Sequence, residues 1–289
     1  IVTHTLKAGL VQMTSSTDVE ENVRIASGYI REAAAAGAAL VATPEMTTLL
    51  ERSRKRALAA AAAEAHDHAL PAFRALAAEL SIHLLIGSIP VRLEGEEMLA
   101  NRSVLIGPDG AVLARYDKIH MFDVALGSGE SYRESETYRP GREAVLAETE
   151  LGRLGLTICY DVRFAHLYRG LAKAGAEILM VPAAFTRVTG EAGHWHTLLR
   201  ARAIETGCFV LAPAQTGDHA DGRSTYGHSL AVAPWGEILA DGETAPGVIS
   251  LELDMGAVAR ARSRVPAIEH DRPFDRCTVT AAREEEPEK

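Results

Sequence analysis

The sequence predicts an α/β fold made of two similar halves, whose sheets pack face to face and carry helices on their outer faces. A strand–helix–strand pattern occurs near the start of the chain and again in its second half. A β-hairpin also recurs at one constant offset along the chain. The identical positions are Ser103, Pro108, Gly110, Leu113 and Ala114 in the first half and Ser229, Pro234, Gly236, Leu239 and Ala240 in the second. Burying two apolar sheet faces against each other gives a four-layer α-β-β-α sandwich with internal pseudo-two-fold halves. A single doubly wound sheet would leave the matched hairpins unexplained.

The first half begins with a strand over residues 6–13. Asp18 with Glu21 three residues later predicts a capping box that opens an Ala-rich helix ending near Gly37. A short buried strand follows at 40–43. The matched offsets place extra chain at 51–68, whose basic run at 52–56 favours an exposed helix with a solvated face. Another helix, a strand at 82–86 and the first hairpin complete this half.

The second half repeats this order. It contains a strand at 154–160, a helix at 164–174 ended by Gly175, and a strand at 178–181. A helix from His194 to Thr206, a strand at 208–212 and the second hairpin follow. A short helix then runs from after Asp254 to Arg264. We expect one domain over residues 1–275, and a C-terminal extension over 276–289 with an acidic, disordered end.

Charge and cysteine content exclude several function classes. The net charge is -9, with 30 Lys and Arg against 39 Asp and Glu, which disfavours nucleic acid and anionic membranes as partners. No apolar run reaches the ~18 residues of a membrane span, and the first residues lack a signal-peptide pattern, so we expect a cytoplasmic protein. The three cysteines are widely spaced, which excludes a disulfide framework and a CxxC motif. Cysteine chemistry here would be that of a free thiol.

Cys159 has the position expected of a nucleophile. It lies at the carboxyl end of a predicted strand and directly before a helix, where α/β sheets gather their ligands. A helix N-terminus and a nearby cation would lower the pKa of its thiol from the ordinary ~8.5. Cys208, by contrast, stands in an apolar strand and is expected to be buried and structural. His194 and His196 are conceivable zinc ligands, but no further ligands stand at suitable spacing, so we expect no metal.

Two other charged residues follow predicted strands in the first half only. Glu45 comes after the strand at 40–43, and its counterpart in the second half is Ala183. Lys118 ends the first hairpin, where the second hairpin ends at Asp241. Each charge alone would be interpreted as solvated. Together with Cys159, each at a strand end of one sandwich, they favour a shared role over separate solvation of each charge.

With these residues in place, the sequence resembles the nitrilase, or carbon-nitrogen hydrolase, superfamily over nearly its whole length. The motifs that carry the resemblance are AGLVQM at 8–13, TPEM at 43–46, YDKIHMFD at 116–123, CYDVRF at 159–164 and PWG at 234–236. The resemblance implies the α-β-β-α fold and a Glu-Lys-Cys triad of Glu45, Lys118 and Cys159. It also implies a fourth catalytic residue, Glu134.

The chemistry that this resemblance implies is amide hydrolysis without a cofactor. Glu45 takes the thiol proton while Cys159 attacks the amide carbonyl, and Lys118 with the backbone N–H of Tyr160 faces the oxyanion. Ammonia leaves, and water hydrolyses the resulting thioester. A binding protein that had lost catalysis would normally lack a triad member, whereas all three are present.

Within the superfamily the chain resembles the Nit branch, and the deaminated glutathione amidases more than the omega-amidases. Both act on small 2-oxo-acid amides, so the resemblance implies a carboxylate-binding contact, for which Arg163, Arg187 and His194 are candidates beside Phe185. Gly193 is an extra residue relative to the family pattern near these positions. Alternative activities are those of an omega-amidase, a nitrilase, an N-carbamoyl amino acid hydrolase or an acyltransferase.

We also expect a homodimer or a larger homo-oligomer. The helices from Phe164 and from His194 carry Leu167, Leu171, Leu198 and Leu199, which a lone sandwich would leave on its outer layer, and nitrilase relatives pair through such helices. A two-fold interface of ~1,600 Å² or more would cover them.

Overall fold

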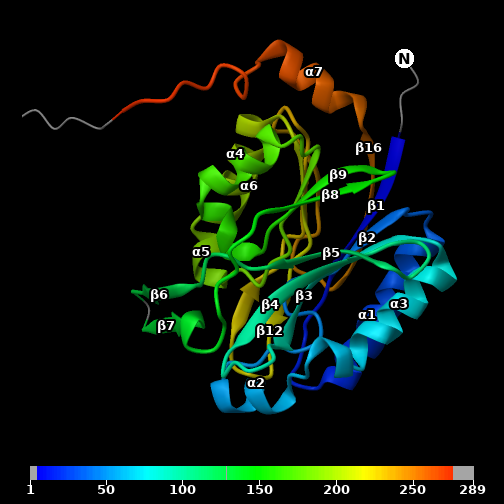
Figure 1. Ribbon diagram of the computed structural model, residues 1–289, viewed down its shortest axis with the longest axis vertical. Coiled ribbons are helices and arrows are strands. Elements are labelled where there is room, and N and C mark those ends of the chain that lie inside the picture. Colours follow the sequence, from blue (N-terminus) through cyan, green and yellow to red (C-terminus); the bar gives the residue numbers. More distant parts are fainter. Residues whose placement is uncertain (1–4, 128, 276–289) are drawn as a thin grey trace, which may run out of the picture.

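Two large sheets pack face to face, with helices on both outer sides (Figure 1). This architecture is seen in a computed structural model that describes residues 5–127 and 129–275. It confirms the four-layer α-β-β-α sandwich. The expected extension at 276–289, which includes Cys277, lies outside the described residues.

Each large sheet has six strands, and the two sheets share one topology. The first sheet runs in the order β16 (Gly247–Asp254), β1 (Thr5–Gln12), β2 (Leu40–Ala42), β3 (His83–Arg92), β4 (Leu99–Ile106) and β5 (Val112–Asp117). The second runs in the order β8 (Val145–Thr149), β9 (Gly152–Leu156), β10 (Ile178–Met180), β11 (Phe209–Ala212), β14 (Leu230–Val232) and β15 (Ile238–Asp241). In each, three central strands are parallel and their neighbours antiparallel.

The two halves match down to their irregularities. The β4–β5 ladder shifts register between Leu105 and Ile106, and the β14–β15 ladder shifts between Ala231 and Val232, at the matched positions. Both hairpin turns end on a glycine with positive φ, at 78° in the first and 98° in the second. The pseudo-two-fold repeat therefore extends beyond the identical residues to the backbone conformation. The edge strands β8 and β16, for which we made no prediction, are also equivalent.

Alternation along the strands of the first sheet separates its two packing surfaces. Leu40 and Ala42 of β2 belong to the core between the sheets, whereas Val41 faces the helix layer. In β3, Leu85 likewise faces the second sheet and Leu84 faces the helices. Both faces of the sheet are thus buried, which explains why these strands read as nearly continuous apolar runs.

The helices α1 (Val19–Ala35) and α3 (Ala69–Leu80) cover the first sheet. Asp18 caps α1 by accepting a hydrogen bond from the Glu21 amide at 3.0 Å. The expected capping box is only half formed, because Glu21 bonds to the Ser16 hydroxyl, which in turn accepts from the Asp18 amide. Ser16 thus links the two residues in place of a direct hydrogen bond from the Asp18 amide to the Glu21 carboxylate.

The helices α4 (Ala165–Lys173) and α6 (His194–Thr206) cover the second sheet. Leu167, Leu171 and Leu199 point inward and are buried in the core of the chain itself. Leu198 is partly buried against that core. These four leucines therefore do not form an exposed surface for a homodimer, because α4 and α6 direct them toward the core of the chain.

The extra segment of the first half contains α2 (Arg54–Ala60) and a 3-10 turn at Glu64–His66, between β2 and β3 as expected. Two small hairpins lie at the edge of the sandwich, formed by β6 (Asp123–Leu126) with β7 (Glu130–Arg133) and by β12 (Thr216–Asp218) with β13 (Ser224–Tyr226). The remaining helices are α5 (Arg187–Glu191) and α7 (Gly256–Arg264). Among the described residues, no helix is both long and apolar enough to cross a bilayer.

Candidate active site

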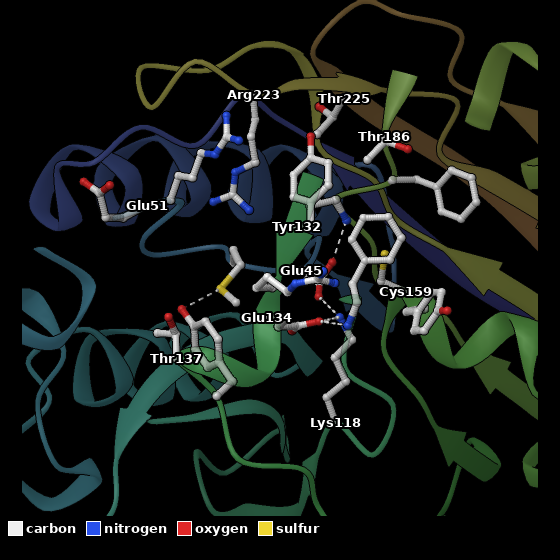
Figure 2. A pocket seen from close by; sticks show the side chains of 18 of the residues that line it. Glu45, Glu51, Lys118, Tyr132, Glu134, Thr137, Cys159, Thr186, Arg223 and Thr225 are labelled. Atoms are coloured by element: carbon white, nitrogen blue, oxygen red, sulfur yellow. Dashed lines mark hydrogen bonds and ion pairs between the residues drawn. The ribbon is translucent and has the colours of Figure 1, made fainter. Parts of the chain in front are cut away.

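Four side chains that the sequence singled out meet at one cavity of about 280 Å³ (Figure 2). Glu45 follows β2, Lys118 follows β5, Glu134 follows β7, and Cys159 follows β9. The sandwich brings these strand ends together from both sheets. Cys159 is only 8% exposed and Glu45 only 4%, so both groups are largely shielded from water.

Lys118 is the centre of this group. Its Nζ lies 2.8 Å from Oε1 of Glu45 and 2.9 and 3.0 Å from the two oxygens of Glu134. Burial disfavours the ammonium ion, but the two carboxylates outweigh burial and hold the pKa of Lys118 well above its ordinary value. Lys118 is therefore a fixed cation in the resting site.

Glu45 accepts hydrogen bonds on both carboxylate oxygens. Oε1 also accepts from Nδ2 of Asn101 at 2.9 Å, and Oε2 accepts from the amide of Ala184 at 2.8 Å. Burial by itself would raise the pKa of Glu45. The charge and hydrogen bond of Lys118, aided by the Ala184 amide, lower that pKa below its ordinary value. Glu45 is therefore ionised at neutral pH.

The Cys159 thiol is held in its protonated form. Burial raises its pKa well above the ordinary value, the charge of Glu45 raises it further, and Lys118 only partly opposes them. This corrects the expectation that a helix N-terminus would lower the thiol pKa. The strand before the thiol ends at Leu156, four residues earlier than the expected end at 160. Cys159 then begins a five-residue 3-10 turn, not an α-helix. The thiol therefore needs a base, and the ionised carboxylate of Glu45, close enough to raise the thiol pKa by its charge, is the candidate.

The backbone at Cys159 forms a sharp elbow. Its φ is +46°, in the left-handed region, and its amide donates to Pro182 O at 2.9 Å. A non-glycine residue in this region carries strain that the surroundings must support. The amide of Tyr160 stands at the start of the 3-10 turn, where amides have no acceptor within the turn. It is therefore available to an oxygen bound in front of the thiol.

Buried Asp161 supports this elbow. One of its oxygens accepts from the Ile158 amide at 2.9 Å and from the Tyr116 hydroxyl at 2.7 Å. The other accepts from the His120 amide at 3.1 Å. Tyr116 and His120 flank Lys118 in the chain, so Asp161 joins the segment that carries the lysine to the turn that carries the thiol.

Asn101 is a site residue that the sequence analysis missed. Its Nδ2 bridges the two carboxylates, at 2.9 Å from Glu45 and 3.1 Å from Glu134, while its Oδ1 is buried without a hydrogen-bond partner. In the sequence Asn101 stands in β4 next to two other polar residues, Arg102 and Ser103. Nothing in the sequence distinguishes it from them, so no signal pointed to its role.

Contacts between the halves fix the backbone that carries Glu45. Gln215 Nε2 donates to the Glu45 carbonyl at 3.0 Å and to the Ser15 hydroxyl at 2.7 Å. Gly87 lies so close that a Cβ there would stand 2.1 Å from the Thr43 carbonyl oxygen. Only glycine allows this approach, so β3 can pack directly under the loop that precedes Glu45.

The comparison with protein families agrees with this geometry. Residues 7–263 match the model of the family described as carbon-nitrogen hydrolase. The chain belongs to the carbon-nitrogen hydrolase family. The chain also resembles the deaminated glutathione amidase of Synechocystis sp., with 42% identity over 91% of this chain and 97% of the relative.

Solved structures of carbon-nitrogen hydrolases share the fold. The NitFhit protein of C. elegans superposes with a TM-score of 0.87 and is 36% identical, over 94% of this chain and 66% of that protein. A variant of the amidase from Nesterenkonia sp. AN1 gives a TM-score of 0.76 at 25% identity, over 90% of this chain and 98% of that one. In that variant acrylamide has added to the active site cysteine.

In this carbon-nitrogen hydrolase, only one of the four expected substrate contacts lines the cavity. Phe185 does so, whereas Arg163, Arg187 and His194 do not. Arg163 lies 3.3 Å from His194 Nδ1, and Arg187 pairs with Asp218 at 2.9 Å. Arg187 and His194 contact residues outside the lining. Arg163 also lies over the rings of Phe185 and Tyr160, at 5.5 and 5.9 Å, and so stands behind two lining residues without lining the cavity itself. Gly193 is also absent from the lining and forms a left-handed turn between α5 and α6.

Besides Lys118, the cations that line the cavity are Arg52, Arg54, Arg133 and Arg223. The basic run at 52–56 is exposed at Arg52 and Arg54, as a solvated face requires, but these two residues also line the cavity. Their exposed side chains reach the cavity rim, which the two small hairpins also form. Neither hairpin was predicted, so the rim could not be foreseen.

His194 and His196, considered as zinc ligands, do not act together. His196 instead meets His228 and Asp241, and the ligand atoms of these three lie within 4.8 Å of one another. Each imidazole lies 2.9 Å from an oxygen of Asp241, so hydrogen bonding already accounts for the grouping. The fold thus brings together possible ligands that sequence spacing had not shown, away from the cavity lining.

Proposed function

We propose that this chain is an amidase of the deaminated glutathione amidase type, acting on a small amide that bears carboxylates. The observation that carries the proposal is the buried Lys118 ammonium, held between Glu45 and Glu134 beside a protonated thiol. The Synechocystis relative supports the choice of substrate. We assign catalysis to Glu45, Lys118 and Cys159, with Glu134 in support.

Acylation begins with the thiol of Cys159 and the carboxylate of Glu45. The thiol proton passes to Glu45 while sulfur forms a bond to the amide carbon. The ionised state of Glu45 and the high pKa of the thiol make this direction of transfer necessary, since free thiolate is scarce at rest. General-base assistance of this kind supplies roughly 10²- to 10⁴-fold in rate.

The oxygen of the attacked carbonyl becomes an oxyanion next to Lys118. The ammonium group and the amide of Tyr160 stabilise this charge, and one such donor is worth about 2.7–4 kcal/mol in a site of this kind. Glu134 keeps Lys118 oriented, because it accepts two hydrogen bonds from Nζ and one from the Phe122 amide at 2.7 Å. The cation therefore stays in place when Glu45 becomes neutral.

Collapse of this intermediate breaks the C–N bond and leaves a thioester on Cys159. Glu45 returns its proton to the departing nitrogen. Deaminated glutathione is a tripeptide-like molecule, so cleavage of either of its amides releases an amine. This corrects the expectation that ammonia leaves, because ammonia is released only from primary amides. Water then gives a proton to Glu45 and attacks the thioester, and the sulfur recovers the proton as the acid departs.

Product analysis by liquid chromatography and mass spectrometry tests this proposal, because an ammonia assay would miss the favoured substrate. Wild-type protein and Cys159→Ala are compared on deaminated glutathione, 2-oxoglutaramate and 2-oxosuccinamate. We expect the highest kcat/KM with deaminated glutathione and none with Cys159→Ala. A preference of ~10-fold or more for a short amide, about 1.4 kcal/mol of transition-state binding, would overturn the substrate and leave the reaction class standing.

We also propose that the chain forms a homodimer, on different residues from those first considered. Ile204 of α6 and Trp235, Ile238 and Leu239 of the second hairpin are between 44% and 55% exposed. The side chain of Ile204 lies against Gly236 of the hairpin turn, next in the chain to Trp235. A grouping of this kind marks an association surface. Sedimentation that shows a monomer at micromolar concentration would contradict the proposal.

A further inference from the structure

Two arginines from opposite halves of the chain reach the same side of the cavity. Arg52 follows β2 in the first half, and Arg223 precedes β13 in the second. Figure 2 shows Arg223 and Glu51 displaced from Lys118 and Cys159, with Tyr132 between the two groups. We call Arg52 and Arg223 the distal arginines. They give the cavity a cationic region apart from the reacting groups.

The distal arginines carry more charge than the nearby carboxylates neutralise. Arg223 pairs with the buried carboxylate of Asp221 at 2.7 Å. Glu51, the next acid along the wall, gives both its oxygens to Arg56 at 2.7 and 2.9 Å. Among the described residues Arg52 has no carboxylate within ion-pair distance. Arg52 therefore reaches the cavity without a direct ion pair.

Contacts with neighbours hold both guanidinium groups near the cavity. The guanidinium carbon of Arg52 lies 5.7 Å from the centre of the Tyr132 ring, and its Nη2 donates to the Ser131 carbonyl at 3.3 Å. Arg223 is half-buried, and Asp221 fixes its Nε. Burial raises the pKa of Tyr132, and Glu130 raises it further by its charge and by accepting a hydrogen bond from the hydroxyl at 3.2 Å. The charges of Arg223 and Arg52 oppose that rise, so both arginines act on the same hydroxyl group.

The charges along the cavity favour binding of a substrate carboxylate at the end that holds the distal arginines. The reacting end already holds the carboxylates of Glu45 and Glu134, which repel a second anion. A guanidinium group offers paired N–H donors that match a carboxylate, and such charge-assisted bonds are stronger than neutral ones. An extended tripeptide is about 10 Å long, enough to join two separate subsites.

We infer that Arg52 and Arg223 form a subsite for a substrate carboxylate remote from the amide under attack. The inference rests on the proposed function, because it supplies the anionic, elongated substrate. Deaminated glutathione has such a carboxylate at each end, one on the 2-oxo acid and one on glycine. Both have the same chemistry, and the experiment below separates them.

The first measurement is equilibrium binding by calorimetry in the Cys159→Ala background, where the ligand is not consumed. The ligands are deaminated glutathione and its two monomethyl esters, each with one carboxylate neutralised. We expect Arg52→Gln and Arg223→Gln each to weaken binding of the diacid by about 10-fold or more. The ester that blocks the bound carboxylate should bind weakly to the Cys159→Ala protein, and its affinity should fall little further in the arginine variants. That ester identifies which carboxylate occupies the subsite.

Lys55→Gln is the matched control. Lys55 belongs to the same basic run, is exposed, and does not line the cavity, so removal of its charge should change affinity by less than about 2-fold. In the catalytically intact protein the two arginine variants should raise KM and leave kcat nearly unchanged. If the arginine variants lose equal affinity for the diacid and for both esters, the two arginines have a merely structural role and the inference is overturned.

The two proposals fail separately. If wild-type protein does not hydrolyse deaminated glutathione, but Cys159→Ala binds it through the distal arginines, the subsite stands and the proposed substrate is wrong. If wild-type protein hydrolyses it and both arginine variants bind and turn it over normally, the subsite is wrong and the proposed function stands. Absence of binding to Cys159→Ala would overturn the subsite directly.

Discussion

Substitution of Glu45 by glutamine separates its role as a base from its role in the structure. The carboxamide keeps the shape of the side chain but cannot take the thiol proton. Since general-base assistance is worth about 10²- to 10⁴-fold, Glu45→Gln should lower kcat by at least ~10²-fold. Lys118 should remain charged and in place, because Glu134 still accepts two of its hydrogen bonds.

The same substitution should cost a definite amount of stability. All three groups that bond to the Glu45 oxygens are donors: Lys118, Asn101 and the Ala184 amide. Either orientation of the new amide therefore sets its NH₂ group against a donor. One unsatisfied buried group costs about 1–3 kcal/mol of unfolding free energy. At ~2–4 °C per kcal/mol for a protein of this size, Tm should fall by roughly 2–12 °C.

Loss of the carboxylate should also make the Cys159 thiol more acidic. Glu45 raises the thiol pKa in the native site, and Lys118 lowers it. Without Glu45 the effect of Lys118 is unopposed, so the midpoint of iodoacetamide alkylation against pH should move to lower pH. The variant would therefore combine much weaker turnover with a more readily ionised nucleophile.

The assay compares kcat, Tm and the alkylation profile in wild-type protein, Glu45→Gln and Glu64→Gln. Glu64 accepts from Arg102 at 2.8 Å and from Arg115 at 2.6 Å, and it does not line the cavity. The control should lose stability and keep its activity. Retention of more than about a tenth of wild-type kcat by Glu45→Gln, or an alkylation midpoint at higher pH, would refute the assigned role.

Further outcomes follow from the same geometry. Because the pKa of Glu45 is lowered, activity and the stability that its ionised form contributes should persist as pH falls to about 4.5 and disappear only below it; an acid limb near pH 6.5 in kcat/KM would contradict this. A slow substrate should leave its acyl group on Cys159 in a peptide mass map, and an adduct on Cys208 would exclude the assignment. Gly87→Ala should destabilise the fold by about 1–3 kcal/mol in denaturant titrations and lower kcat, since its Cβ would collide with the Thr43 carbonyl. Activity should survive treatment with EDTA. If EDTA abolishes activity and added zinc restores it, the protein requires a metal.

Features within a short stretch of chain, or repeated along it, could be predicted from the sequence. The matched hairpins indicated two equivalent sheets, and the shared register shifts confirm that equivalence. The strand-end positions of Glu45, Lys118 and Cys159 placed all three at one cavity. These predictions succeeded because strand periodicity, turn residues and topology depend on local conformation and on which face is apolar.

Only the tertiary structure decided which side chains meet. Asn101 bridges two carboxylates, and Arg52 and Arg223 approach one cavity, through contacts between segments far apart in the chain. The same reason explains the errors. Leu199 was expected on an outer surface and is buried, and Arg163, expected at the substrate, lies behind the cavity lining, over the ring of Phe185. Residue type and spacing indicate what a side chain can do, but its partner, its burial and hence its pKa depend on the packed neighbours.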